Sequence, residues 1–154
     1  MKTRMNTYIS VSIEQQLCMV AVSLLIAMWI YTVGNKLLDY PSFRIQIMEQ
    51  PLPFFVSTIL KWVLIPVEML AAILLLFPRG RKTGLLLSLT LMSLFTVYVA
   101  LLLLFDKHLP CACGGPVPNW GWGQHLAFNI TFTLVALIGF ISSYKAERRK
   151  AMSP

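Results

Sequence analysis

The chain has 154 residues, of which 57% are hydrophobic and only 12% are charged, and its mean hydropathy is +0.71. This composition excludes an ordinary soluble domain, and the length favours one membrane domain over residues 1–154. The net charge of +7 does not indicate a nucleic-acid partner, because the basic residues lie at the ends of apolar runs and not on one water-facing surface.

Four apolar runs predict membrane-spanning helices at about 14–34, 54–77, 84–105 and 124–144. Each run approaches or exceeds the ~20 residues that a helix needs to cross the hydrocarbon. We therefore predict an all-α membrane protein, a bundle of four transmembrane helices with both termini on the same side of the membrane.

The distribution of basic residues predicts the orientation of this bundle. Nine of the 13 lysines and arginines lie at the termini or between the second and third spans: Lys2, Arg4, Arg79, Arg81, Lys82, Lys145, Arg148, Arg149 and Lys150. The other two loops carry only Lys36, Arg44 and Lys107. The positive-inside rule then predicts cytoplasmic termini and places the loop 106–123 outside.

The first span carries Trp29 and Tyr31, which we expect near the outer interface, where such rings settle. Pro41 follows the span and should stop regular structure there. The next segment, 42–50, mixes apolar and polar residues and is long enough for two helical turns. It predicts a short helix on the outer surface that caps the bundle, with an ordinary connector as the alternative.

The second span contains Lys61 and Glu68, which lie seven positions apart and therefore on one helix face. Glu68 should lie near the middle of the bilayer, where a charged carboxylate needs a partner or must face the bundle. Two roles for Glu68 stay open: a hydrogen bond that fixes helix packing, or the handling of a proton or ligand. Cys18, in the first span, is expected to be a small buried side chain.

The segment between the third and fourth spans holds two thiols one residue apart, Cys111 and Cys113, followed by two glycines. A disulfide between positions i and i+2 closes a very small ring, so it should be easily reduced. Thiol–disulfide exchange also needs a base or cation that lowers the thiol pKa. His125, His108, Lys36 or Lys107 could supply this group, and His125 is favoured because it lies at the start of the last span. His125, Asn129 and Thr133 recur every four residues and form one polar stripe.

Two other interpretations of the cysteines stay open. A permanent structural bridge would close almost no chain and would stabilise the fold little. Cys111, Cys113, His108 and His125 would make a four-ligand metal set, although the cysteine spacing is shorter than zinc sites usually have, and Cu(I) is the softer alternative. With one outer cysteine pair, either quinone reaches the thiols directly or a thioredoxin-like partner exchanges with them. No cofactor is fixed by the sequence.

Four motifs together resemble the MauE family of methylamine utilisation, redox-associated membrane proteins related to DoxX. They are Asn35-Lys36-Leu37-Leu38 with Pro41 and Phe43, Pro66-x-Glu68, Cys111-x-Cys113-Gly114, and Trp122-Gly123-Gln124-His125. The resemblance implies a four-helix bundle in a bacterial inner membrane, associated with disulfide formation or reduction in periplasmic proteins. It makes Cys111 and Cys113 the redox pair and places Lys36 and Glu68 in the lining of the bundle.

We therefore expect an inner-membrane thiol–disulfide redox protein that exchanges electrons with a periplasmic thioredoxin-like or client protein, with quinone as an open partner. Its site would consist of Cys111, Cys113 and His125, with Lys36, Lys61, Glu68 and Asn129 lining the bundle as groups that handle a proton or a ligand. The rival hypothesis is a non-enzymatic subunit of a larger secretion, respiratory or maturation complex, and copper or zinc handling ranks third. The direction of electron flow stays open.

Overall fold

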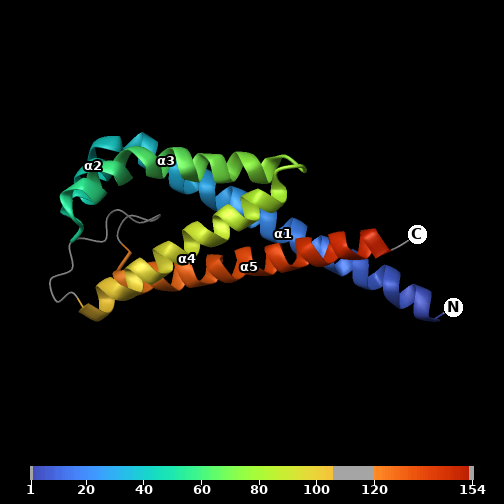
Figure 1. Cartoon of the computed structure of the whole chain (residues 1–154). Coiled ribbons are helices and arrows are strands. Elements are labelled where there is room, and N and C mark those ends of the chain that lie inside the picture. The colour runs from blue at the N-terminus through green and yellow to red at the C-terminus, as the bar shows by residue number, and fades with distance from the viewer. Residues whose placement is uncertain (1, 106–119, 153–154) are drawn as a thin grey trace.

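The computed structural model describes residues 2–105 and 120–152, and this part of the chain forms five α-helices (Figure 1). They are α1 (Lys2–Leu38), α2 (Tyr40–Glu49), α3 (Phe54–Leu76), α4 (Arg81–Phe105) and α5 (Trp122–Met152). Within the described residues, α1, α3, α4 and α5 are long and apolar enough to cross a membrane. The predicted all-α architecture with four spanning helices and a short helix after the first span is confirmed.

The four long helices form a bundle in which each packs on two neighbours. α1 contacts α3 and α5, and α4 contacts the same two helices from the other side. The beginning of α1 and the end of α5 lie together at one end of the bundle, whereas α2 lies at the opposite end (Figure 1). This agrees with the prediction that both termini share one side, while their cytoplasmic placement stays a prediction.

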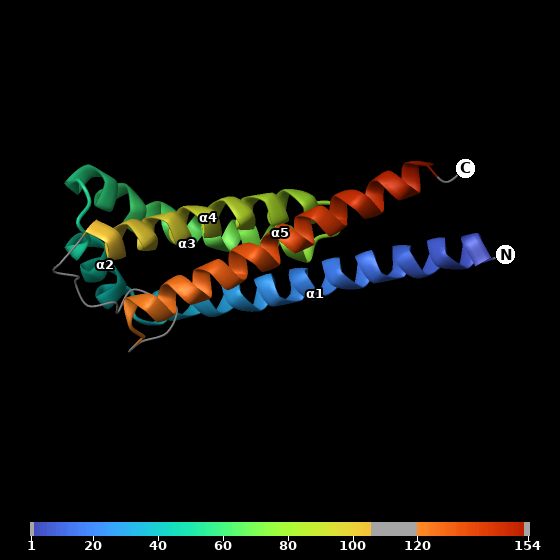
Figure 2. The same ribbon diagram turned by 90° about the horizontal axis from the view of Figure 1, so that it is seen from below.

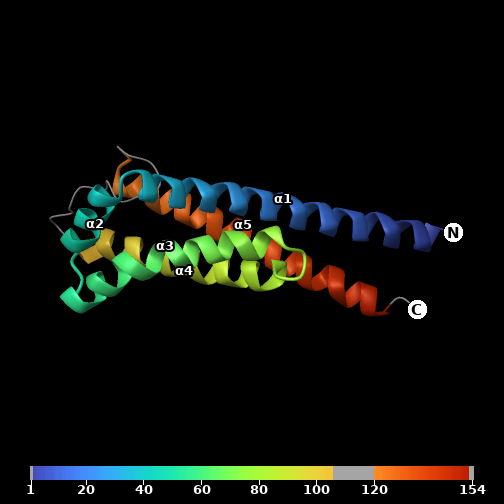
Figure 3. The same ribbon diagram turned by 90° about the horizontal axis from the view of Figure 1, so that it is seen from above.

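α1 and α5 are longer than the spans predicted for them. No glycine or proline precedes Gly34, so nothing interrupts α1 from Lys2 onwards. α1 and α5 therefore extend side by side beyond the turn between α3 and α4 (Figures 2 and 3). Arg149 donates to Glu14 across this extension at 3.1 Å, which joins the end of α5 to α1.

The expectation that Pro41 stops regular structure is wrong, because α2 begins at Tyr40 and Pro41 lies in its first turn. Proline suits that position because the first amides of a helix have no intrahelical acceptor. The carboxylate of Asp39 caps the helix by accepting from the Ser42 amide at 3.3 Å. The ring of Phe43 is buried, and it packs with Val33 of α1 and Ile65 of α3. Thus α2 is anchored to the bundle and is more than a loose connector.

Trp29 is not at the interface where we expected it, because it lies in the core and is only 1% exposed. Its indole N–H donates to the hydroxyl of Ser88 on α4 at 2.9 Å. A buried indole needs such an acceptor, and Ser88 supplies one inside an otherwise apolar span. Cys18 is a buried member of the same core, as expected for a small apolar side chain.

Close contact between helices requires a glycine at position 139 of α5. A Cβ atom added there would lie 2.9 Å from both the Cβ of Ala21 on α1 and a Cδ of Leu85 on α4. Both neighbours belong to tightly packed parts of the bundle, so neither can move away without cost. Gly139 thus lets three helices approach one another, as small residues do in membrane bundles.

We predict that Gly139→Ala destabilises the bundle by about 1–3 kcal/mol, because the added methyl group overpacks this junction. The matched control is Gly123→Ala, since a Cβ at Gly123 of the same helix meets nothing within 4 Å. The stability of each variant is measured by unfolding the purified protein in a titration with denaturing detergent. Equal stability of the two variants would contradict the close packing of α1, α4 and α5.

Candidate functional site

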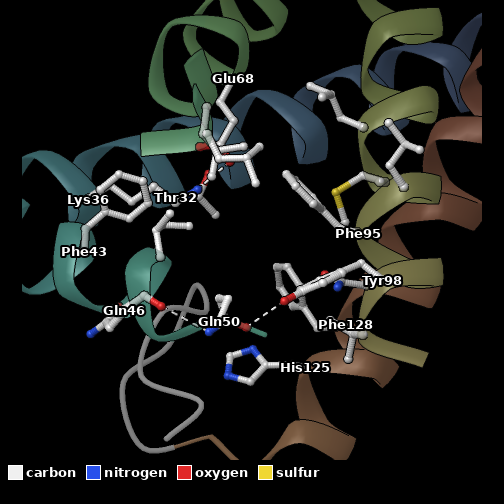
Figure 4. Close-up of a pocket in the computed structure, with 18 of the residues that line it drawn as sticks. Thr32, Lys36, Phe43, Gln46, Gln50, Glu68, Phe95, Tyr98, His125 and Phe128 are labelled. Atoms are coloured by element: carbon white, nitrogen blue, oxygen red, sulfur yellow. Dashed lines mark hydrogen bonds and ion pairs between the residues drawn. The ribbon is translucent and has the colours of Figure 1, made fainter. Parts of the chain in front are cut away.

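A cavity of about 470 Å³ lies toward the α2 end of the bundle, and all five helices contribute to its wall (Figure 4). Its volume is in the range usual for small-molecule sites. Most of the wall is apolar, with the rings of Phe95 and Phe128 facing the space (Figure 4). The polar groups of the wall are Thr32, Lys36, Gln46, Gln50, Glu68, Tyr98, His125 and Asn129.

An ion pair between Lys36 and Glu68 forms one side of this cavity (Figure 4). The ammonium of Lys36, in the last turn of α1, donates to Oε1 of Glu68 in the middle of α3. The side chains are 13% and 1% exposed, so the pair is almost completely shielded. Lys36 Nζ also lies 5.8 Å from the ring centre of Phe43, which adds a cation–π contact. A charged pair in this environment survives only because each charge has the other.

The second carboxylate oxygen of Glu68, Oε2, is buried and has no hydrogen-bond partner among the described residues. Buried acceptors of this kind are uncommon in folded proteins, and each calls for an explanation. Glu68 lines the cavity, so this unsatisfied acceptor belongs to a residue of the cavity wall.

Glu68 is paired with Lys36 and not with Lys61, although the sequence places Lys61 on the same face of α3. Lys61 is partly exposed and is not among the residues that line the cavity. The sequence did not indicate which lysine would reach Glu68, because this depends on how α1 crosses α3.

The residues of the polar stripe on α5 make two kinds of contact. His125 and Asn129 are buried and line the cavity, whereas Thr133 forms a hydrogen bond of 3.0 Å with Thr96 on α4. The side chain of Gln124 accepts from the Gly121 amide at 2.9 Å, which is half of a capping box and fixes the start of α5. His125 is therefore held in the first turn of a capped helix.

Two tryptophans lie beside the imidazole of His125. The ring centres of Trp120 and Trp122 lie 5.9 Å and 6.4 Å from the His125 ring. His125 thus occupies an aromatic environment at the α2 end of the cavity.

A hydrogen-bonded chain that the sequence did not reveal joins α2 to α4. Tyr98 donates to Oε1 of Gln50 at 2.8 Å, and the amide nitrogen of Gln50 donates to the Gln46 carbonyl at 3.2 Å (Figure 4). A tyrosine within an apolar span was the available signal for this contact. The chain fixes the end of α2 over the cavity.

Cys111, Cys113 and His108 lie outside the described residues. The segment that carries them connects Phe105, at the end of α4, to Trp120, just before α5. Both of these helix ends lie at the same end of the bundle as α2 (Figure 1). The metal interpretation of Cys111, Cys113, His108 and His125 depends on this segment and stays a hypothesis.

We predict that Lys36→Met destabilises the bundle by about 3 kcal/mol, because it leaves the Glu68 carboxylate buried without a counter-ion. The double variant Lys36→Met/Glu68→Leu should recover most of that loss, since both charges are then absent. Detergent unfolding of the two single variants and the double variant gives the coupling energy.

The matched control is Lys82→Met, which breaks the exposed pair between Lys82 and Glu147. That change should cost less than about 1 kcal/mol, because exposed pairs contribute little. If the losses of stability in the two single variants of Lys36 and Glu68 add up to the loss in the double variant, the two groups do not form a pair.

Comparison with known proteins identifies the family. A model of the family described as methylamine utilisation protein MauE matches residues 14–142. This range includes α2, α3, α4 and all residues of the cavity wall. No curated protein and no solved structure matches the chain. The match extends over most of the chain. The protein is therefore a member of the MauE family.

Proposed function

We propose that this protein is a membrane thiol–disulfide oxidoreductase, or the membrane component of one, in which Cys111 and Cys113 exchange electrons with a thioredoxin-like or client protein. The observation that carries the proposal is the Cys-x-Cys pair in the segment that joins α4 to α5. That segment is attached at the cavity end of the bundle, where the polar groups gather.

The chemistry requires one thiolate that attacks, a second thiol that resolves the mixed disulfide, and a group that stabilises the thiolate. Cys111 and Cys113 supply the first two parts. His125 is the candidate for the third, because a capped helix start holds it rigidly and Trp120 and Trp122 fix its surroundings. The sequence separates Cys113 from His125 by only 12 positions.

The charge distribution supports an orientation with the thiols on the outer side of a bacterial inner membrane. Lys82, Arg148 and Arg149 lie toward the end of the bundle where α1 begins and α5 ends, and basic residues of this kind favour the cytoplasm. The cysteine segment then faces the periplasm. Disulfides persist in that compartment, whereas the cytosol keeps thiols reduced.

We predict that Cys111→Ser and Cys113→Ser each abolish thiol–disulfide exchange, and that one of them accumulates a mixed disulfide with a periplasmic protein. Removing the resolving thiol leaves the first covalent intermediate with no way to proceed. Non-reducing electrophoresis of membranes, followed by mass spectrometry of the adduct, detects this species.

Cys18→Ser is the matched control. Cys18 is buried in the core and should form no adduct, so its replacement should leave exchange unchanged. After mild reduction, a membrane-impermeant thiol reagent should label Cys111 and Cys113 in intact cells. If removing both outer thiols leaves exchange and partner oxidation unchanged, the protein is instead an assembly subunit whose permanent partners survive in mild detergent.

A further inference from the structure

The cavity has a feature that the exchange of thiols alone does not require. Oε2 of Glu68 is a buried acceptor without a partner among the described residues, and it belongs to a side chain that is 1% exposed. Aromatic and aliphatic side chains, including Phe95 and Phe128, form most of the remaining cavity wall (Figure 4). The site therefore combines an unsatisfied acceptor with walls suited to a flat apolar ring.

We propose that this cavity binds a quinone, in both its oxidised and its quinol form, as the electron acceptor of the thiol pair. The choice of acceptor rests on the proposed function, because oxidising two thiols requires an acceptor of two electrons. All residues of the binding site belong to the part of the chain that the structure describes.

The charges in the cavity favour a neutral ligand. Lys36 and Glu68 neutralise each other, so the pair offers no net charge to an anion or a cation. An ammonium has three N–H groups, and the bond to Glu68 Oε1 uses one of them. Lys36 can therefore donate to a quinone carbonyl, while Oε2 of Glu68 accepts from a quinol hydroxyl. The same pair thus complements both redox forms.

The walls provide a route from the lipid. Val63 of α3 and Leu94 of α4 line the cavity and are 46% and 61% exposed. An opening of the cavity toward the lipid between α3 and α4 would account for this exposure. A ligand dissolved in the membrane can enter from the side, and an isoprenoid chain can remain in the lipid.

The proposed reaction balances without a further reactant. Oxidation of the two thiols forms one S–S bond and releases two electrons and two protons. The quinone takes up both electrons and both protons, and its two carbonyl oxygens become hydroxyls. Glu68 accepts a hydrogen bond from one of these hydroxyls at the end of the reaction.

The test is equilibrium binding of a short-chain alkylated benzoquinone, and of its quinol under reducing conditions, to the protein in lipid nanodiscs. Quenching of tryptophan fluorescence reports binding, because Trp29 and Trp122 line the cavity. We expect saturable binding by the wild-type protein and by the Cys111→Ser/Cys113→Ser variant alike. Val63→Phe should weaken the affinity about tenfold by filling the cavity.

Ile59→Phe is the matched control, since Ile59 lies one turn earlier on α3, is 56% exposed and does not line the cavity. It should bind like the wild type. The neutral double variant Lys36→Met/Glu68→Leu should lose about tenfold in affinity for both forms, because both polar partners are gone. Thermal unfolding confirms that each variant is folded.

Equal affinity of Val63→Phe and Ile59→Phe would overturn the proposal, because it would mean that the quinone only partitions into the lipid. Absence of saturable quenching would overturn it as well, and so would a phospholipid retained in the cavity by native mass spectrometry. These outcomes leave the thiol chemistry intact, since exchange by Cys111 and Cys113 is measured separately. Conversely, unchanged exchange in the Cys111→Ser/Cys113→Ser variant, with quinone still bound, would refute only the proposed function.

Discussion

The ion pair between Lys36 and Glu68 determines how the α2 end of the bundle is built. An isolated charge in the middle of an apolar helix is costly, so Glu68 requires a cation that another helix brings to it. Lys36 does so from the last turn of α1, where the helix dipole also favours a positive charge. The pair therefore fixes the position of α1 on α3. The pair also makes one wall of the cavity polar, because one carboxylate oxygen of Glu68 is paired and the other is buried without a partner among the described residues.

The remaining features follow from the need to cover this polar centre. α2 lies across the end of the bundle, places Phe43 beside the ammonium of Lys36, and is fastened to α4 through Gln50 and Tyr98. The capped start of α5 brings His125 and Asn129 to the opposite wall. Toward the other end the packing is apolar and close, as Gly139 shows, so that part of the bundle serves as scaffold. The structure thus separates a rigid half from a half that can hold a ligand.

The four spans and the short helix could be predicted from the sequence, because long apolar runs and basic flanks are strong local signals. So could the importance of Glu68, since a carboxylate inside a span is costly wherever it points. Its partner could not be predicted, because Lys36 and Lys61 are equally plausible until the crossing of α1 and α3 is known. Trp29 was wrongly expected at the interface, since a hydroxyl on a distant helix, Ser88, allows its burial. The cavity combines all five helices, and no local pattern encodes such a space.

We propose that Cys111 and Cys113 pass electrons into the membrane through this bundle. The most direct measurement is the redox state of Cys111 and Cys113 in intact cells, read from the mass shift after alkylation, with and without quinone synthesis. We expect a disulfide in cells that make quinone and free thiols in cells that do not, with Cys18 reduced in both. Thiols whose state is the same in the two kinds of cell would contradict this proposal.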